Sequence, residues 1–387
     1  MPDVHSRFPA SASHRWINCP GSIRLSESAH LVEPESAYAT EGTLAHAIAE
    51  QKLRIAIDKT VKASDLKRLT KDPLYDGEMD EATTYYSGLV MEHYNAAGPD
   101  AELMIEQRVD FSDWVPGGFG TSDAIITNDD TIEVIDLKYG KGIRVDAEGN
   151  SQMRLYALGA LAMYGALYDF DKARMTIVQP RLDHVSVEEM TITDLLEWAK
   201  VYVVPAAELA ASDDAPLAAG DWCRWCPARA TCRKRAEANL ELARYDFQPG
   251  DLLSDDEIGE ILSKVDELTK WTADIEAYAL QQALNGVTYD GWKLVEGRSV
   301  RKYKDEDAVA KALQAEGFNE AMLYERKLLG ITAMEKLVGK KKLGEVCKDL
   351  IEKPAGKPVL VPASDKREPI NSAAQAAADF KDRKSVV

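Results

Sequence analysis

The chain has 387 residues, of which 45% are hydrophobic and 29% charged, as is typical of a folded globular protein with two or three domains. Its formal net charge of −18 argues against a protein that coats duplex DNA by bulk electrostatic attraction, although a local basic groove can coexist with an acidic remainder. Its five cysteines are spaced too unevenly for a disulfide framework.

The apolar stretches predict no membrane-spanning helix. The most apolar of them, Leu155–Leu167, is too short and is interrupted by glycine. The opening Met1–Arg7 lacks the apolar segment of a secretory signal. We therefore expect a cytoplasmic protein with no membrane partner.

The first part of the chain predicts helices followed by strands. Apolar residues recur at helical spacing over residues 41–57, with Thr40 as the expected N-cap, and a second helix is expected over 78–95. Alternating residues then predict strands over 101–111, 120–127 and 131–139, the last two joined as a hairpin.

A helix over 150–168, strands over 173–179 and 185–190, and a helix ending near 213 complete the predicted core. This order indicates the α/β class, with a mixed sheet flanked by helices. Beyond it we expect a long helix over 251–284 capped by Ser254, a hairpin over 287–303 and short helices. The predicted parts are a core over 1–245, a helical region over 246–355 and a flexible tail over 356–387.

The tripeptide Asp136-Leu137-Lys138 ends the third predicted strand. Side chains alternate along a strand, so Asp136 and Lys138 emerge on one face while Leu137 enters the core. A carboxylate that holds a hard cation, beside a Lys that polarises water, is the pair that a hydrolytic nuclease needs. The same tripeptide also occurs as a solvated ion pair.

Other polar residues accompany this tripeptide. Asp123 begins the neighbouring strand, where it either adds a second carboxylate or caps a turn. His46 follows Gly42, whose missing side chain would let another element approach, on a mostly apolar helix face; a structural core histidine is the alternative. Carboxylates with one imidazole suit Mg²⁺ or Mn²⁺. Glu106 is a weaker candidate, a strand-face carboxylate.

Two further pairs flank the tripeptide. Gln152 and Tyr156 lie four residues apart and share a helix face, either as part of the site or as a surface polar and a core aromatic residue. Lys141 and Arg144, in the loop before that helix, either grip phosphate or are solvated.

Four cysteines have a spacing that indicates a metal site. Cys19 lies near the N-terminus, and Cys223, Cys226 and Cys232 follow as Cys-x-x-Cys-x5-Cys. Four thiolates suit either zinc or an iron–sulfur cluster, and spacing alone leaves both open. Cys347 is expected to be an ordinary half-buried thiol.

Basic and aromatic residues are interleaved in the hairpin expected over 287–303. Arg298, Arg301 and Lys302 would neutralise phosphates there while the aromatic rings stack on bases, or they belong to a solvated strand face.

The motifs occur in a fixed order that resembles the PD-(D/E)xK nuclease superfamily in its RecB-like branch. They are Gly42 with His46, Gly120-Thr121-Ser122-Asp123, Asp136-Leu137-Lys138 and Gln152-x-x-x-Tyr156. The cysteines are similar to those of the iron–sulfur nucleases of that branch, including CRISPR-associated RecB-like exonucleases and AddB-type nucleases. Cys19-Pro20-Gly21-Ser22 and the C-terminal half look like a group of phage-encoded proteins. The resemblance implies a restriction-endonuclease-like sheet, a 4Fe-4S clamp and a mostly helical C-terminal region.

The resemblance also implies residue roles. His46, Asp123, Asp136 and the Leu137 carbonyl would hold one or two divalent ions. Lys138 would orient the attacking water. The scissile backbone would be positioned by Gln152 and Tyr156, and the cluster would be held by Cys19, Cys223, Cys226 and Cys232.

The expected function is that of a metal-dependent DNA exonuclease acting on single strands or duplex ends. Phage recombination or replication is the expected setting, and proteins of those processes are the expected partners. One alternative is a non-catalytic DNA-binding or scaffold protein that retains the fold. Another is a zinc-stabilised adaptor with no nucleic-acid partner.

Overall fold

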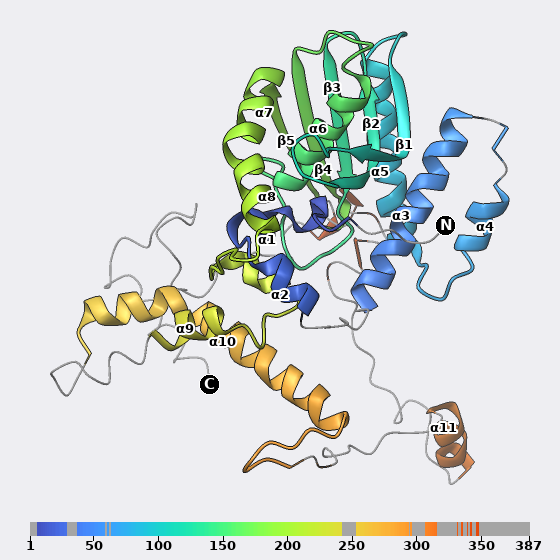
Figure 1. The fold of residues 1–387 in the computed structure, drawn as a ribbon. Coiled ribbons are helices and arrows are strands. Elements are labelled where there is room, and N and C mark those ends of the chain that lie inside the picture. The colour runs from blue at the N-terminus through green and yellow to red at the C-terminus, as the bar shows by residue number, and fades with distance from the viewer. Residues whose placement is uncertain are drawn as a thin grey trace. The chain divides into compact units, whose positions relative to one another are not determined.

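The computed structural model describes residues 6–28, 37–58, 60–61, 63–241, 253–293, 295 and 306–315, and a few single positions between 331 and 347. Contacts divide the chain into two units, Met1–Gly286 and Val287–Val387. The first unit contains the sheet and the candidate site (Figure 1). No helix in the described part of the chain is long and apolar enough to cross a membrane.

A five-stranded mixed sheet forms the centre of the first unit. Its strands lie in chain order: β1 (Glu102–Asp110), β2 (Phe119–Thr127), β3 (Thr131–Leu137), β4 (Lys172–Gln179) and β5 (His184–Thr191). Only the β3–β4 pair is parallel, because α6 (Ser151–Tyr164) connects these two strands and returns the chain to the same end of the sheet. The predicted mixed α/β class is confirmed.

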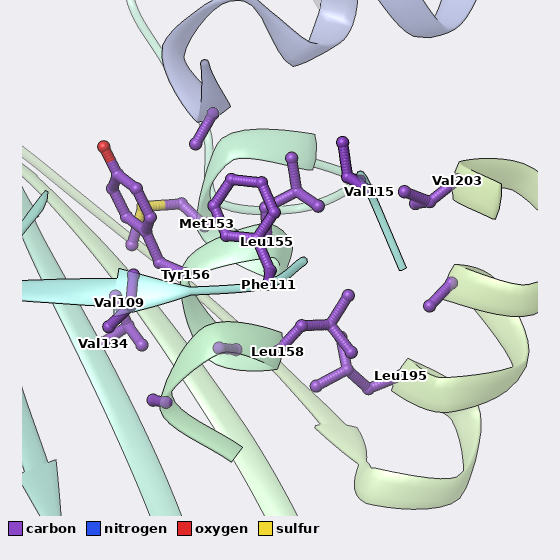
Figure 2. Close-up of a cluster of buried hydrophobic side chains, with 14 of the residues drawn as sticks. Val109, Phe111, Val115, Val134, Met153, Leu155, Tyr156, Leu158, Leu195 and Val203 are labelled. Carbon is purple, nitrogen blue, oxygen red and sulfur yellow. The ribbon is translucent and has the colours of Figure 1, made fainter. Parts of the chain in front are cut away.

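One face of the sheet is covered by α6 and by the segment α7 (Ile192–Trp198), η3 (Ala199–Val203) and α8 (Val204–Ala211). Figure 2 shows part of this core, in which α6 side chains meet strand residues; the labelled residues include Met153, Leu155, Tyr156, Leu158, Val109 and Val134. Burial of these apolar side chains stabilises the packing of α6 on the sheet.

The opposite face packs against α3 (Ala37–Ile57) and α5 (Gly77–Ala96). The N-terminus of α5 is capped by Asp76, whose side chain accepts a hydrogen bond from the Met79 amide. Between these helices lies α4 (Ser64–Leu69), and before them are η1 (Ala10–Ala12), α1 (Ser13–Asn18) and α2 (Ser22–Ser28). The site described below lies where α3 approaches the sheet.

The cysteine segment follows α8. It comprises η4 (Asp221–Trp225) and α9 (Arg233–Leu240), and α10 (Asp255–Leu284) packs against α9. The capping box of Ser254 and Glu257 begins α10 as predicted. α10 makes ion pairs with α9 and belongs to the first unit, which ends at Gly286.

Three local predictions need correction. Thr40 is not an N-cap, since α3 already begins at Ala37. α6 ends at Tyr164 rather than 168, with Gly165 as its C-cap. The hairpin expected over 287–303 has no strand in its described residues 287–293, where Asp290 and Gly291 form a turn; α11 (Glu306–Ala315) follows. The tail over 356–387 lies outside the described residues.

Candidate metal and hydrolytic site

Three carboxylates lie in one row across neighbouring strands. Ala124 of β2 pairs with Ile135 of β3, and one further antiparallel step places Asp123 opposite Asp136. On the other side of β2, the pairs that flank Glu106 place it opposite Asp123 as well. Directly opposed like charges destabilise a sheet. This row therefore needs nearby positive charge, either from side chains or from a bound cation.

Glu106 interrupts the regular backbone of β1. Its φ is 50°, in the left-handed region that side chains other than glycine adopt rarely, and no ladder pair includes it although the pairs on either side are regular. Such strain persists when the surroundings impose it, and it occurs often at functional sites. Glu106 was predicted only as a weaker candidate, because strand alternation does not reveal a residue with a locally inverted backbone.

His46 of α3 completes a group that could hold a cation. Its Nδ1 lies 3.1 Å from Asp123 Oδ1, and ligand atoms of His46, Glu106 and Asp123 all lie within 4.8 Å of one another. Leu137 is part of the same pocket lining, and its amide donates a 2.7 Å hydrogen bond to Asp123 Oδ2. One imidazole and two carboxylates suit Mn²⁺ or Mg²⁺.

Burial and neighbouring charges shift the pKa values of His46 and Glu106. Burial lowers the pKa of His46, but the Asp123 carboxylate more than offsets this and raises the pKa to about 9. Burial raises the pKa of Glu106 to about 7, and the charge of Asp123 adds to the effect. In the absence of a cation, the raised pKa of His46 leaves a protonated imidazole beside the Asp123 carboxylate.

Asp136 and Lys138 belong to a second network beside the first. Lys138 Nζ lies 2.9 Å from Asp136 Oδ2 and donates to Gln152 Oε1 at 3.0 Å. The Gln152 amide nitrogen contacts Asp136 Oδ1 at 3.4 Å and the Tyr156 hydroxyl at 3.1 Å. Asp136 is 3% exposed, and burial raises its pKa against the opposing charge of Lys138. The fold therefore brings together four predicted site residues, namely Asp136, Lys138, Gln152 and Tyr156.

Local sequence explains how α6 presents this network. Asn150 caps the helix by accepting hydrogen bonds from the amides of Gln152 and Met153, which fixes the first turn beside β3. A Cβ at Gly120 would lie 2.7 Å from the Tyr156 ring, so glycine is needed there for the ring to approach β2. By contrast, a Cβ at Gly42 would meet no described atom within 4 Å, and the expected close approach at that position is wrong.

The four predicted cysteine ligands converge on one pocket. Cys19, Cys223, Cys226 and Cys232 all line it, and all four are buried and free of disulfides. No three of these thiols lie within 4.8 Å of one another. Four sulfurs around a single zinc ion would lie about 3.8 Å apart, given Zn–S bonds of about 2.3 Å. The four thiols are thus farther apart in this structure than the sulfurs of a closed zinc site.

Comparison with known proteins gives a family of undescribed function. Residues 5–368 match the family model described as "Protein of unknown function (DUF2800)". The chain belongs to this family. One similar solved structure is described as "Crystal structure of SSO0001"; it has 18% sequence identity and a TM-score of 0.23, and the match covers 57% of this chain and 96% of that chain. A TM-score this low carries no argument about fold or function.

The predicted DNA-contacting residues have other partners or lie outside the described residues. Lys141 makes a 2.6 Å ion pair with Glu78, and Arg144 makes a 3.0 Å ion pair with Asp146. Both cations are therefore partly neutralised within the DUF2800 chain. The remaining three, Arg298, Arg301 and Lys302, lie outside the described residues.

Proposed function

We propose that this DUF2800 protein is a divalent-metal-dependent DNA exonuclease with a PD-(D/E)xK, RecB-like catalytic site. The observation that carries the proposal is the carboxylate row with His46 at one end and Lys138 at the other. A solvated ion pair on an ordinary strand would not require a second and a third carboxylate in the same row, nor an imidazole from a separate helix.

The donor set fits a hard divalent cation. His46, Glu106 and Asp123 would hold it, with Asp136 at the adjacent position in the row. When bound, such a cation polarises a phosphoryl oxygen and lowers the pKa of water. Glu106 thereby joins the ligands predicted from the sequence.

Each remaining side chain has a task that follows from its contacts. Lys138 carries a positive charge beside Asp136, where it would orient water and stabilise negative charge developing on phosphorus. Gln152 bonds both Lys138 and Tyr156, so it fixes the direction of the ammonium group and of the phenol. The Leu137 amide holds Asp123 in place, and the Leu137 carbonyl stays a predicted further ligand of the cation.

The four thiols of the cysteine pocket would hold a structural 4Fe-4S cluster. Its four thiols come from Cys19 at one end of the core and from the Cys223–Cys232 segment at the other, so a cluster would tie these distant segments together. Metal binding of this kind contributes directly to folding free energy. The cluster has no part in the hydrolytic step.

End-labelled single- and double-stranded DNA, incubated with Mn²⁺ or Mg²⁺ and followed by product length, tests the proposal. We expect progressive shortening from an end, abolished by Asp123→Asn. Glu133→Gln is the matched control, because Glu133 is a buried carboxylate of the same sheet whose partners are His93 and Thr176. Binding without cleavage by the parent under either metal would instead favour a DNA-binding protein that retains the fold.

A further inference from the structure

A buried arginine joins the cysteine pocket to α10. Arg235 is 1% exposed, and its Nε and Nη1 atoms lie 2.6 Å from Glu267 and 2.6 Å from Asp274, respectively, both on α10. Arg229 pairs with Asp274 at 3.1 Å. Burying an ion pair costs desolvation, which is offset only when the remaining donors find partners.

The third nitrogen of Arg235 lacks such a partner in the described part of the chain. Its Nη2 is buried and donates no hydrogen bond to any described residue, and Arg235 lines the pocket formed by the four thiols. An unsatisfied buried donor of a charged group costs several times as much as a typical hydrogen bond contributes. The position of this donor indicates that an acceptor belongs in the pocket.

We propose that Arg235 is a positioning residue that compensates the charge of the metal-loaded thiolates and thereby couples loading of the cysteine site to docking of α10. Four thiolates around a doubly charged metal core leave a net charge of about −2, and a buried guanidinium is the natural donor to such sulfurs. This inference rests on the proposed cluster but not on nuclease activity.

The coupling follows from the shared guanidinium. Arg235 bonds α10 through two nitrogens and also lines the pocket, so a negative charge in the pocket would hold the guanidinium in the orientation that α10 requires. Coupling between two sites is reciprocal, so docking of α10 must strengthen metal retention by the same factor.

Hydrogen exchange on the anaerobically purified full chain tests the proposal. Amide exchange is compared in the iron-loaded protein and after iron removal by ferricyanide and a chelator, with iron content and visible absorption recorded in parallel. We expect exchange in 255–284 to rise about 5- to 150-fold on iron removal, the usual range for coupled sites. Exchange in β2 and β3 should stay unchanged. Equal exchange in α10 with and without iron would overturn the proposal.

The reverse effect, of α10 docking on iron retention, is tested with substitutions on α10, which is far from the thiols in sequence. Asp274→Asn should accelerate iron loss to a chelator, since it weakens the anchoring of Arg235. Lys264→Met is the matched control: Lys264 also connects α10 to the end of α9, through Glu241, but does not line the pocket. Equal iron loss from both variants would refute the coupling.

The outcome is distinguishable from that of the proposed function. A chain that carries iron and shows coupled exchange but never cleaves DNA would refute the nuclease proposal and leave the role of Arg235 standing. A chain purified without bound metal would refute the role of Arg235, whatever its activity.

Discussion

Glu106→Gln should stabilise the metal-free protein while weakening its response to Mn²⁺. Glu106 is held opposite Asp123 on a strained backbone. Burial and the Asp123 charge make its ionised form destabilise the folded state. Gln has nearly the same shape and carries no charge, so the substitution removes the penalty without leaving a cavity. A purely structural glutamate would behave in the opposite way, because its loss would remove stabilising contacts.

The size of the effect follows from the pKa. Burial and the charge of Asp123 raise the Glu106 pKa from the ordinary 4.5 to about 7. Each pKa unit corresponds to about 1.4 kcal/mol, so the ionised side chain destabilises the folded state by at most about 3 kcal/mol. A raised carboxyl pKa destabilises only once the group ionises, so this penalty grows from pH 4.5 and is complete above pH 7.

Urea unfolding in EDTA at pH 5 and pH 8.5, followed by circular dichroism, measures this difference. The variant should be more stable than the parent by less than about 1 kcal/mol at pH 5, where Glu106 ionises only in the unfolded chain, and by about 1–3 kcal/mol at pH 8.5. Adding Mn²⁺ at pH 8.5 should stabilise the parent more than the variant, because ligand binding to the folded state adds stability. A variant that is less stable at both pH values and responds equally to Mn²⁺ would refute the assignment of Glu106 as a ligand.

Three further predictions concern the neighbouring networks. Lys138→Ala should keep Mn²⁺ affinity, measured by titration, yet lose about 10²-fold or more in the DNA cleavage rate, whereas an unchanged rate would exclude Lys138 from the chemistry. The pKa of His93 is raised by its hydrogen bond to Glu133, so His93→Gln should lower the free energy of unfolding by about 1–3 kcal/mol below pH 6.5. This loss should shrink as the pH rises through the raised pKa. A loss that does not change with pH would contradict the charged pair. Cys226→Ala should lose bound iron, while Cys347→Ala should not, and stoichiometric zinc in the parent would contradict the iron–sulfur assignment.

Periodicity predicted the elements that position the site. The alternation around Asp123 and Asp136 predicted a hairpin, and the register of β2 and β3 confirms it with both carboxylates in one row. The helix bearing Gln152 was predicted from apolar spacing, and its cap at Asn150 also follows from local chemistry. The hairpin and the helix each depend on residues that are close together in the sequence, so the spacing of apolar and polar residues is enough to predict them.

The parts that escaped prediction depend on contacts between distant segments. Glu106 joins His46 because β1 inverts its backbone at one residue, and nothing in an alternating pattern marks that position. Arg235 looks like one of several surface cations in the sequence, and only the docking of α10 makes it a buried charge. The hairpin expected from interleaved aromatic and basic residues has no strand in residues 287–293, and its second half lies outside the described residues.

The two networks explain how an acidic row can fold without a cation. Protonated His46 lies beside Asp123, and Lys138 places a positive charge beside Asp136, so each part is locally compensated. The two compensations differ in kind. The His46 proton is exchangeable and can be replaced by an incoming cation, whereas the Lys138 charge stays beside Asp136 throughout. If the proposed cation binds, its loading should release the His46 proton, while the positive charge of Lys138 stays beside Asp136.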